Sequence, residues 1–227
     1  DQFYSQKQMN QLIEESDELI AILKKHKLND ELSMVFYDLG SSFFTVNENK
    51  SLTYYLLSFN QSRDNFWVKP ISAYYIGIIY RRAGDYKKAI QYLKIVINYP
   101  YLKQNALASI SFYYSHLHQC DSAIKYYRLL IDTSFYSHPI YKRAEAYIYL
   151  CQEDYKNGLP LLEKCIEFGE SSPENSNTYH YLVYYYSDFY RIHRKLGNQA
   201  IATEAIEKIK KALPKFDRDL LGYQGRK

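Results

Sequence analysis

The chain has 227 residues, enough for one or two globular domains or for a row of about five to six helix pairs. Hydrophobic residues make up 47% of the chain and charged residues 24%, as in an ordinary folded protein, and no run of about 18 apolar residues could cross a bilayer. The net charge of +4 comes from Lys and Arg spread along the chain, so we expect this segment to bind no nucleic acid.

Residues 1–31 are predicted to form an N-terminal capping helix. Met9, Leu12 and Leu23 belong to a set of apolar residues that recur at helical spacing between about Ser5 and Lys27. Acidic residues precede basic residues along this segment, which is the order that the helix dipole favours.

After this helix, small residues recur at a nearly constant spacing. Ala89, Ala123, Gly158 and Ala202 are separated by steps of 34, 35 and 44 residues, and Leu52 fits as a weaker register point 37 residues before Ala89. A period near 34 residues indicates stacked helix pairs.

The step of 44 residues predicts an insertion near residues 170–178. Glu170 to Asn177 is a polar segment, and Thr178 is expected to cap a helix that ends near Lys195. Pro160 fits only in a first helical turn, so its helix should begin no earlier than about Tyr155. Residues 215–227 are expected to form a polar tail or linker.

The clearest copy of the repeat resembles the tetratricopeptide repeat. The resemblance implies an all-α fold, a right-handed α-solenoid of antiparallel helix pairs with about 11 helices, and about five pairs between residues 32 and 214. The residues that carry it are Ala73, Gly77, Tyr80, Gly84, Asp85, Tyr86, Ala89, Leu93 and Pro100.

The same resemblance implies that the first helix of each pair lines a concave groove for a protein or peptide ligand. The positions of the repeat that face the groove hold aromatic residues on one side of the predicted groove and basic residues on another side. The predicted groove residues are Tyr37, Phe44, Tyr74, Ile78, Arg81, Arg82, Asn105, Phe112, His116, Arg143, Tyr147, Arg191, Arg194 and Lys195.

Arg and Tyr together would suit an extended peptide with acidic groups. The family's dicarboxylate clamp needs Lys and Asn at positions that here hold Tyr37 and Ser41, or Tyr74 and Ile78, so the clamp is not expected. An alternative remains open for the basic residues near helix C-termini: they complement the helix dipole and stay solvated.

The sequence contains no phosphate-binding glycine loop, zinc-binding H-E-x-x-H pair or nucleophile elbow, so we expect no enzyme activity, no cofactor and no catalytic or metal site. The leading interpretation is a noncatalytic scaffold that binds proteins or peptides. The alternative is a sensory or regulatory domain of a longer bacterial regulator, exported or membrane-anchored. The missing initial Met and the polar end motivate that alternative.

The three cysteines are Cys120, Cys151 and Cys165. Their odd number and the absence of a C-x-x-C spacing favour packing as small apolar residues and leave the compartment open. The missing initial Met slightly favours a removed export signal. Tyr-rich residues 179–186 suggest a homodimer contact, with packing against the preceding helix pair as the alternative.

Overall fold

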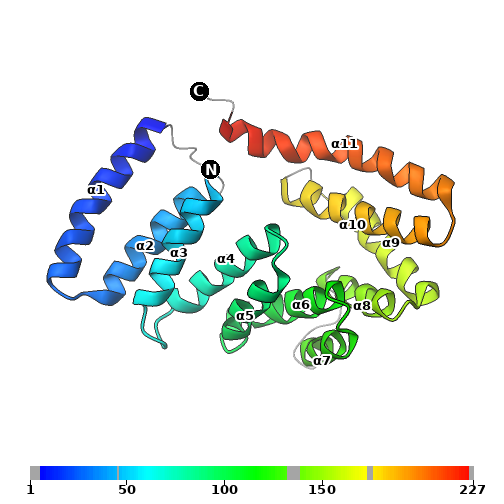
Figure 1. The fold of residues 1–227 in the computed structure, drawn as a ribbon, viewed down its shortest axis with the longest axis horizontal. Helices are drawn as coiled ribbons and strands as arrows, with labels where there is room; N and C mark the ends of the chain where they lie inside the picture. The colour runs from blue at the N-terminus through cyan, green and yellow to red at the C-terminus, as the bar shows by residue number, and fades with distance from the viewer. Residues whose placement is uncertain (1–5, 45, 132–138, 173–175, 225–227) are drawn as a thin grey trace. The chain divides into compact units, whose positions relative to one another are not determined.

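The computed structural model describes residues 6–44, 46–131, 139–172 and 176–224. The described residues form helices joined by turns and contain no strand, so the all-α prediction is confirmed (Figure 1). The helices are α1 (Gln6–Lys25), α2 (Asn29–Phe43), α3 (Glu48–Gln61), α4 (Val68–Arg82), α5 (Tyr86–Val96), α6 (Pro100–His116), α7 (Cys120–Ile131), α8 (Pro139–Cys151), α9 (Tyr155–Ser171), α10 (Ser176–Lys195) and α11 (Gln199–Gln224).

The chain divides into two compact units, and the boundary lies within α6. Unit 1 comprises residues 1–106 with 223–227, and unit 2 comprises residues 107–222. In unit 1 the contacting neighbours are α1 with α2, α2 with α3, α3 with α4 and α4 with α5, and α2 also contacts α4. In unit 2 the same neighbour-to-neighbour packing joins α7, α8, α9 and α10. Packing between consecutive helices is the arrangement expected of stacked helix pairs.

The helix α1 packs against α2 through its apolar stripe. Ile20 and Leu23 of α1 form a cluster with Leu32, Phe36 and Leu39 of α2.

Among the described residues, none of the helices combines the length and the apolar character needed to span a membrane.

One turn geometry recurs at the end of the first helix of four pairs. Gly84, His118, Glu153 and Gly197 all have positive φ, between 55° and 78°. In each turn the next backbone amide donates to the carbonyl five residues before it, at 2.9 Å. These bonds satisfy carbonyl groups that would otherwise be unpaired at the helix end. The positions follow the steps of 34, 35 and 44 residues that the sequence predicts.

The small residue of the repeat is the fourth residue of the second helix in each pair, and it is buried every time. In α3 that position is Ser51, whereas Leu52 is half-buried, so the register point assigned to Leu52 is wrong by one residue. The equivalent position holds a polar serine and not an alanine or glycine, so the repeat position could not be recognised in the sequence. The full set is Ser51, Ala89, Ala123, Gly158 and Ala202.

Buried serines join the helices of unit 1. The Ser51 hydroxyl in α3 donates to the Gly40 carbonyl in α2 at 2.7 Å. The Ser58 hydroxyl lies 2.8 Å from the Ser33 carbonyl of α2 and 2.8 Å from the Ser72 hydroxyl of α4. Because these groups are shielded from water, each needs its partner, and the network fixes how α2, α3 and α4 pack.

The helix α9 begins at Tyr155, where the sequence predicts its earliest start. Pro160 is nevertheless its sixth residue and lies in the second turn, so the reasoning from a first-turn proline is wrong. Proline cannot donate to the carbonyl four residues earlier, at Lys156. Both residues are exposed, so water can take the place of the missing donor.

The helices near the predicted insertion and tail are longer than expected. The helix α9 continues to Ser171 and α10 starts at Ser176, so Thr178 lies inside α10 and does not precede it. The helix α11 extends through residue 214 to Gln224. Residues 215–224 are therefore helical, because the segment after Pro214 contains few helix-breaking residues.

Candidate functional site

Unit 1 carries a cluster of aromatic side chains on the adjoining helices α2, α3 and α4. We define this aromatic cluster as Tyr37, Phe44, Tyr55, Trp67, Tyr74 and Tyr75. Phe44 caps the C-terminal end of α2 and Trp67 caps the N-terminal end of α4, so the turns as well as the helices place these rings.

The rings are in direct contact. Tyr55, which is fully buried, stacks on Tyr75 with centroids 5.0 Å apart and planes 4° apart. Phe44 meets the same Tyr75 ring edge-on at 5.2 Å, and Tyr37 lies 6.0 Å from Trp67. Trp67 is 41% exposed, so the cluster runs from the core to the surface. Aromatic pairs at these distances add stability beyond the area that they bury.

Burial also affects the hydroxyl groups of the cluster. Burial, followed by the neighbouring Tyr75, raises the pKa of Tyr37 to about 12. Burial likewise raises the pKa of Tyr55. Both hydroxyl groups are therefore uncharged at physiological pH.

A paired cation borders the aromatic cluster. Arg82 donates to the Glu48 carboxylate at 2.6 Å, and its guanidinium lies 4.6 Å from the centroid of the Phe44 ring. The Arg82 side chain is 28% exposed. An acidic ligand would have to compete with Glu48 for this guanidinium, so Arg82 acts first as a support for Phe44.

Unit 2 brings together predicted groove residues from three helices that each begin a pair. Phe112 of α6 meets Tyr147 of α8 edge-on with centroids 4.5 Å apart, and it lies 4.1 Å from the His116 ring. The Tyr147 hydroxyl donates to the Asp188 carboxylate of α10. Arg191, one turn further along α10, donates to the other Asp188 oxygen at 2.7 Å. We refer to these five residues as the α10 network.

The carboxylate of Asp188 is the centre of the α10 network. Its side chain is only 9% exposed, and burial of a charge is tolerated where hydrogen bonds and an opposite charge compensate it. Tyr147 and Arg191 supply these, and the Nε2 atom of His116 lies 3.9 Å from Asp188 Oδ2. The Nδ1 atom of His116 lies 3.1 Å from the Phe112 carbonyl, which can only accept, so Nδ1 carries the hydrogen.

The C-terminal end of α10 is basic and accessible. Arg191 is 68% exposed although it holds Asp188, and Arg194 donates to the Tyr190 hydroxyl at 3.1 Å. Lys195 pairs with Glu153 at 2.6 Å, with both side chains more than half exposed. Exposed pairs of this kind contribute little stability, so these cations can exchange partners.

The structure places the remaining predicted groove residues less informatively. Ile78 and Arg81 are half-buried in α4, and Asn105 is exposed in α6. Arg143 lies in α8, but its side chain is outside the described residues. The structure thus brings part of the predicted set together in two local groups, with Tyr37, Phe44, Tyr74 and Arg82 in unit 1 and Phe112, His116, Tyr147 and Arg191 in unit 2.

Sequence reasoning missed three partners of these groups. Trp67 and Glu48 fall outside the first-helix register, whereas that register does select Asp188, without showing that Tyr147 and Arg191 pair with it. The third is a disulfide between Cys120 and Cys151, which are 31 residues apart. The separation of 31 residues is close to the repeat period, and this spacing is the sequence feature that could have indicated the pairing. Cys165 is buried in α9, as expected for a small apolar residue.

No group of three or more His, Cys, Asp or Glu side chains that could hold a metal ion occurs in the described part of the chain. Each predicted cation with a described partner belongs instead to an ion pair or a hydrogen bond. Both groups present rings, hydroxyls and charges.

Comparison with known proteins identifies the repeat. Residues 72–100, which span most of α4 and all of α5, match the family described as tetratricopeptide repeat. This chain carries a tetratricopeptide repeat. The match contains the buried residues Ala73, Gly77 and Ala89, and at Gly77 the helix α4 lies against Ala89 and Leu93 of α5.

Comparison with solved structures finds similar chains at low sequence identity. A single-substitution variant of the kinesin light chain-like repeats of Podosopora anserina is 13% identical, covers 84% of this chain and 98% of its own length, and has a TM-score of 0.50. The unsubstituted protein has a TM-score of 0.47 with the same identity and coverage. PilF of Pseudomonas aeruginosa is 11% identical over 96% of this chain and 99% of its own, with a TM-score of 0.48. No curated protein matches the chain.

Proposed function

We propose that this chain is a noncatalytic scaffold that binds a segment of another protein through the first helices of its pairs. The observation that carries this proposal is the aromatic cluster of unit 1, where rings from α2 and α4 pack around the buried Tyr55 of α3 and continue to the exposed Trp67. Aromatic side chains that are held by their neighbours contribute strongly to binding, because little conformational freedom is lost on contact.

The ligand class follows from the side chains at each group. In unit 1 the ligand meets rings and neutral hydroxyls, so we propose apolar or aromatic anchors there. In unit 2 the accessible guanidinium groups of Arg191 and Arg194 favour acidic groups, because Arg binds carboxylates with two parallel hydrogen bonds. Each group is proposed as a contact region in its own unit.

A random-peptide library displayed on phage, selected against the whole chain, tests the unit 1 contact. Trp67 is the chain's one tryptophan, so its fluorescence reports binding at the cluster without a label. We expect selected peptides to change this fluorescence and to bind Tyr74→Ala roughly tenfold or more weakly. The matched control is Tyr101→Ala, which removes a ring that is 89% exposed in the same unit.

Equal loss of affinity in both tyrosine variants, or selected peptides that leave Trp67 fluorescence unchanged, would refute binding at the aromatic cluster. The acidic preference has a separate test in unit 2. Arg194→Glu should weaken binding of peptides rich in Asp and Glu, and Lys210→Glu, which reverses an exposed charge on α11, should not. Equal binding by the two charge variants would remove the acidic ligand while leaving the scaffold proposal intact.

A further inference from the structure

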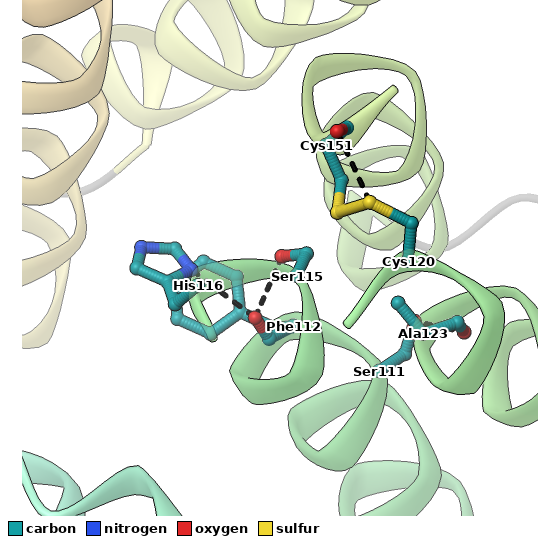
Figure 2. The surroundings of a disulfide bond; sticks show 7 residues. All are labelled: Ser111, Phe112, Ser115, His116, Cys120, Ala123 and Cys151. Atoms are coloured by element: carbon teal, nitrogen blue, oxygen red, sulfur yellow. Dashed lines mark hydrogen bonds between the residues drawn. A yellow bond between two sulfur atoms is a disulfide. The ribbon is translucent and has the colours of Figure 1, made fainter. Parts of the chain in front are cut away.

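Two cysteines lie where α7 begins and α8 ends. Cys120 is the first residue of α7, and Cys151 is the last residue of α8. Their Cα atoms are 5.8 Å apart, within the range that disulfides span, and the structure joins them (Figure 2). The Cys120 sulfur also lies 3.0 Å from the Cys151 carbonyl oxygen. Both side chains are half-buried, so an oxidant can reach them.

We propose that Cys120 and Cys151 are an oxidative modification site and that the protein works in an oxidising compartment. The disulfide holds α8 in the position that places Tyr147 in the α10 network. The two thiols lose two protons and two electrons. A disulfide-containing oxidant takes up both and becomes two thiols, while the Cys120–Cys151 bond forms by exchange. Reducing compartments keep protein thiols reduced, whereas oxidising compartments maintain such bonds.

The position of the bond explains its structural role. Cys151 lies one helical turn after Tyr147, so a tie at Cys151 also fixes the turn of α8 that faces Phe112. On the other side of the bond, α7 is joined to α6 because the Ser111 hydroxyl donates to the Ala123 carbonyl at 2.9 Å. Figure 2 shows the disulfide beside this α6–α7 contact, with Phe112 and His116 on the same α6 helix.

The bond ties α7 to α8, which carries Tyr147, and the Ser111–Ala123 hydrogen bond ties α7 to α6, which carries Phe112 and His116. Tyr147 in turn donates to the buried Asp188 carboxylate. If α8 moved, Asp188 would lose one of its compensating hydrogen bonds. This inference concerns the covalent state of the chain and does not depend on the ligand proposed above.

The compartment is tested on the whole protein in the cells that produce it. Thiols are trapped by acid and a light maleimide, and the protein is then reduced and treated with a heavy maleimide before peptide mass spectrometry. We expect heavy label on Cys120 and Cys151 and light label on Cys165. Light label on both Cys120 and Cys151 would overturn the proposal.

The structural role is tested by hydrogen exchange of the purified chain before and after reduction. We expect α8 amides to exchange at least tenfold faster in the reduced chain, with α4 and α5 unchanged. The Cys120→Ser/Cys151→Ser double variant should match the reduced chain, and Cys165→Ala, which keeps the bond, should match the oxidised chain. If the double variant does not fold, reduction of the wild-type chain still decides the result. Equal exchange in α8 before and after reduction would overturn the structural role.

Discussion

Replacement of Gly40 by alanine tests how tightly the aromatic cluster is packed against α2. A Cβ atom at Gly40 would lie 2.8 Å from Cδ1 of Tyr55 and 3.0 Å from two further ring atoms. Ordinary contacts of this kind begin near 3.4 Å, so the ring would have to shift by about 0.6 Å. Tyr55 is fully buried and contacts Tyr37, Phe44 and Tyr75, which leaves it little room to move.

The expected magnitude follows from two opposing terms. Overpacking of a buried ring costs about 1–3 kcal/mol, and the better helix propensity of alanine returns up to about 1 kcal/mol. Because Tyr55 has little room to move, the cost lies in the upper part of that range, about 2–3 kcal/mol, so after subtraction of about 1 kcal/mol Gly40→Ala should lower the free energy of unfolding by about 1–2 kcal/mol. With a denaturant slope of about 2 kcal/mol per molar urea, the midpoint falls by about 0.5–1 M. Trp67 fluorescence follows this transition, because its ring lies beside Tyr37 in the same unit.

A second background separates the clash from other effects. Tyr55→Ala removes every atom of the ring that the new methyl group would meet, so Gly40→Ala should be neutral or stabilising in that background. Circular dichroism at 222 nm checks that each variant is helical before unfolding. An unchanged or higher urea midpoint for Gly40→Ala alone, or the same loss in both backgrounds, would refute the packing argument.

Three further predictions concern other parts of the chain. Ser58→Ala should lower the free energy of unfolding by about 1–3 kcal/mol in urea titrations, because it leaves buried partners such as Ser72 without their hydrogen bond. His193 is buried, and burial is the main cause that lowers its pKa. The stability that is present above the unfolded pKa of about 6.5 should therefore be lost as the pH falls. The urea midpoint should drop between pH 7 and pH 5.5, and it should drop less in His193→Gln. Gly84→Ala should lower the thermal midpoint because φ is positive there, whereas His118→Gly, at the equivalent turn, should raise the free energy of unfolding by about 0.5–1 kcal/mol.

The helix pairs could be predicted from the sequence because the small residues at their crossings repeat with the period of the fold. Ala89, Ala123, Gly158 and Ala202 are all buried, and they set the register of four pairs. The register failed in α3, where the equivalent residue is a serine whose hydroxyl is satisfied by a carbonyl on the facing helix. A polar residue at a buried position carries no apolar signal, although it packs in the same place.

The candidate site could be predicted only in part, because its partners come from positions that the repeat does not constrain. The register placed Phe112 and Tyr147 together, as the structure shows. It could not show that Glu48 would pair with Arg82, because a separation of 34 residues, one repeat period, does not select this pair from other oppositely charged residues. The 31-residue separation of the joined cysteines is also close to the period, but their contact depends on how α7 meets α8.

The bond between Cys120 and Cys151 also limits how far the chain can be stretched. The 31-residue separation between the cysteines corresponds to roughly 100 Å of extended backbone, at about 3.3–3.6 Å per residue. If the chain is pulled by its ends, the disulfide prevents the segment between the two cysteines from extending. Only the reduced chain could gain this length. The α7–α8 step is thus protected against mechanical load, while the steps on either side rely on side-chain packing and hydrogen bonds.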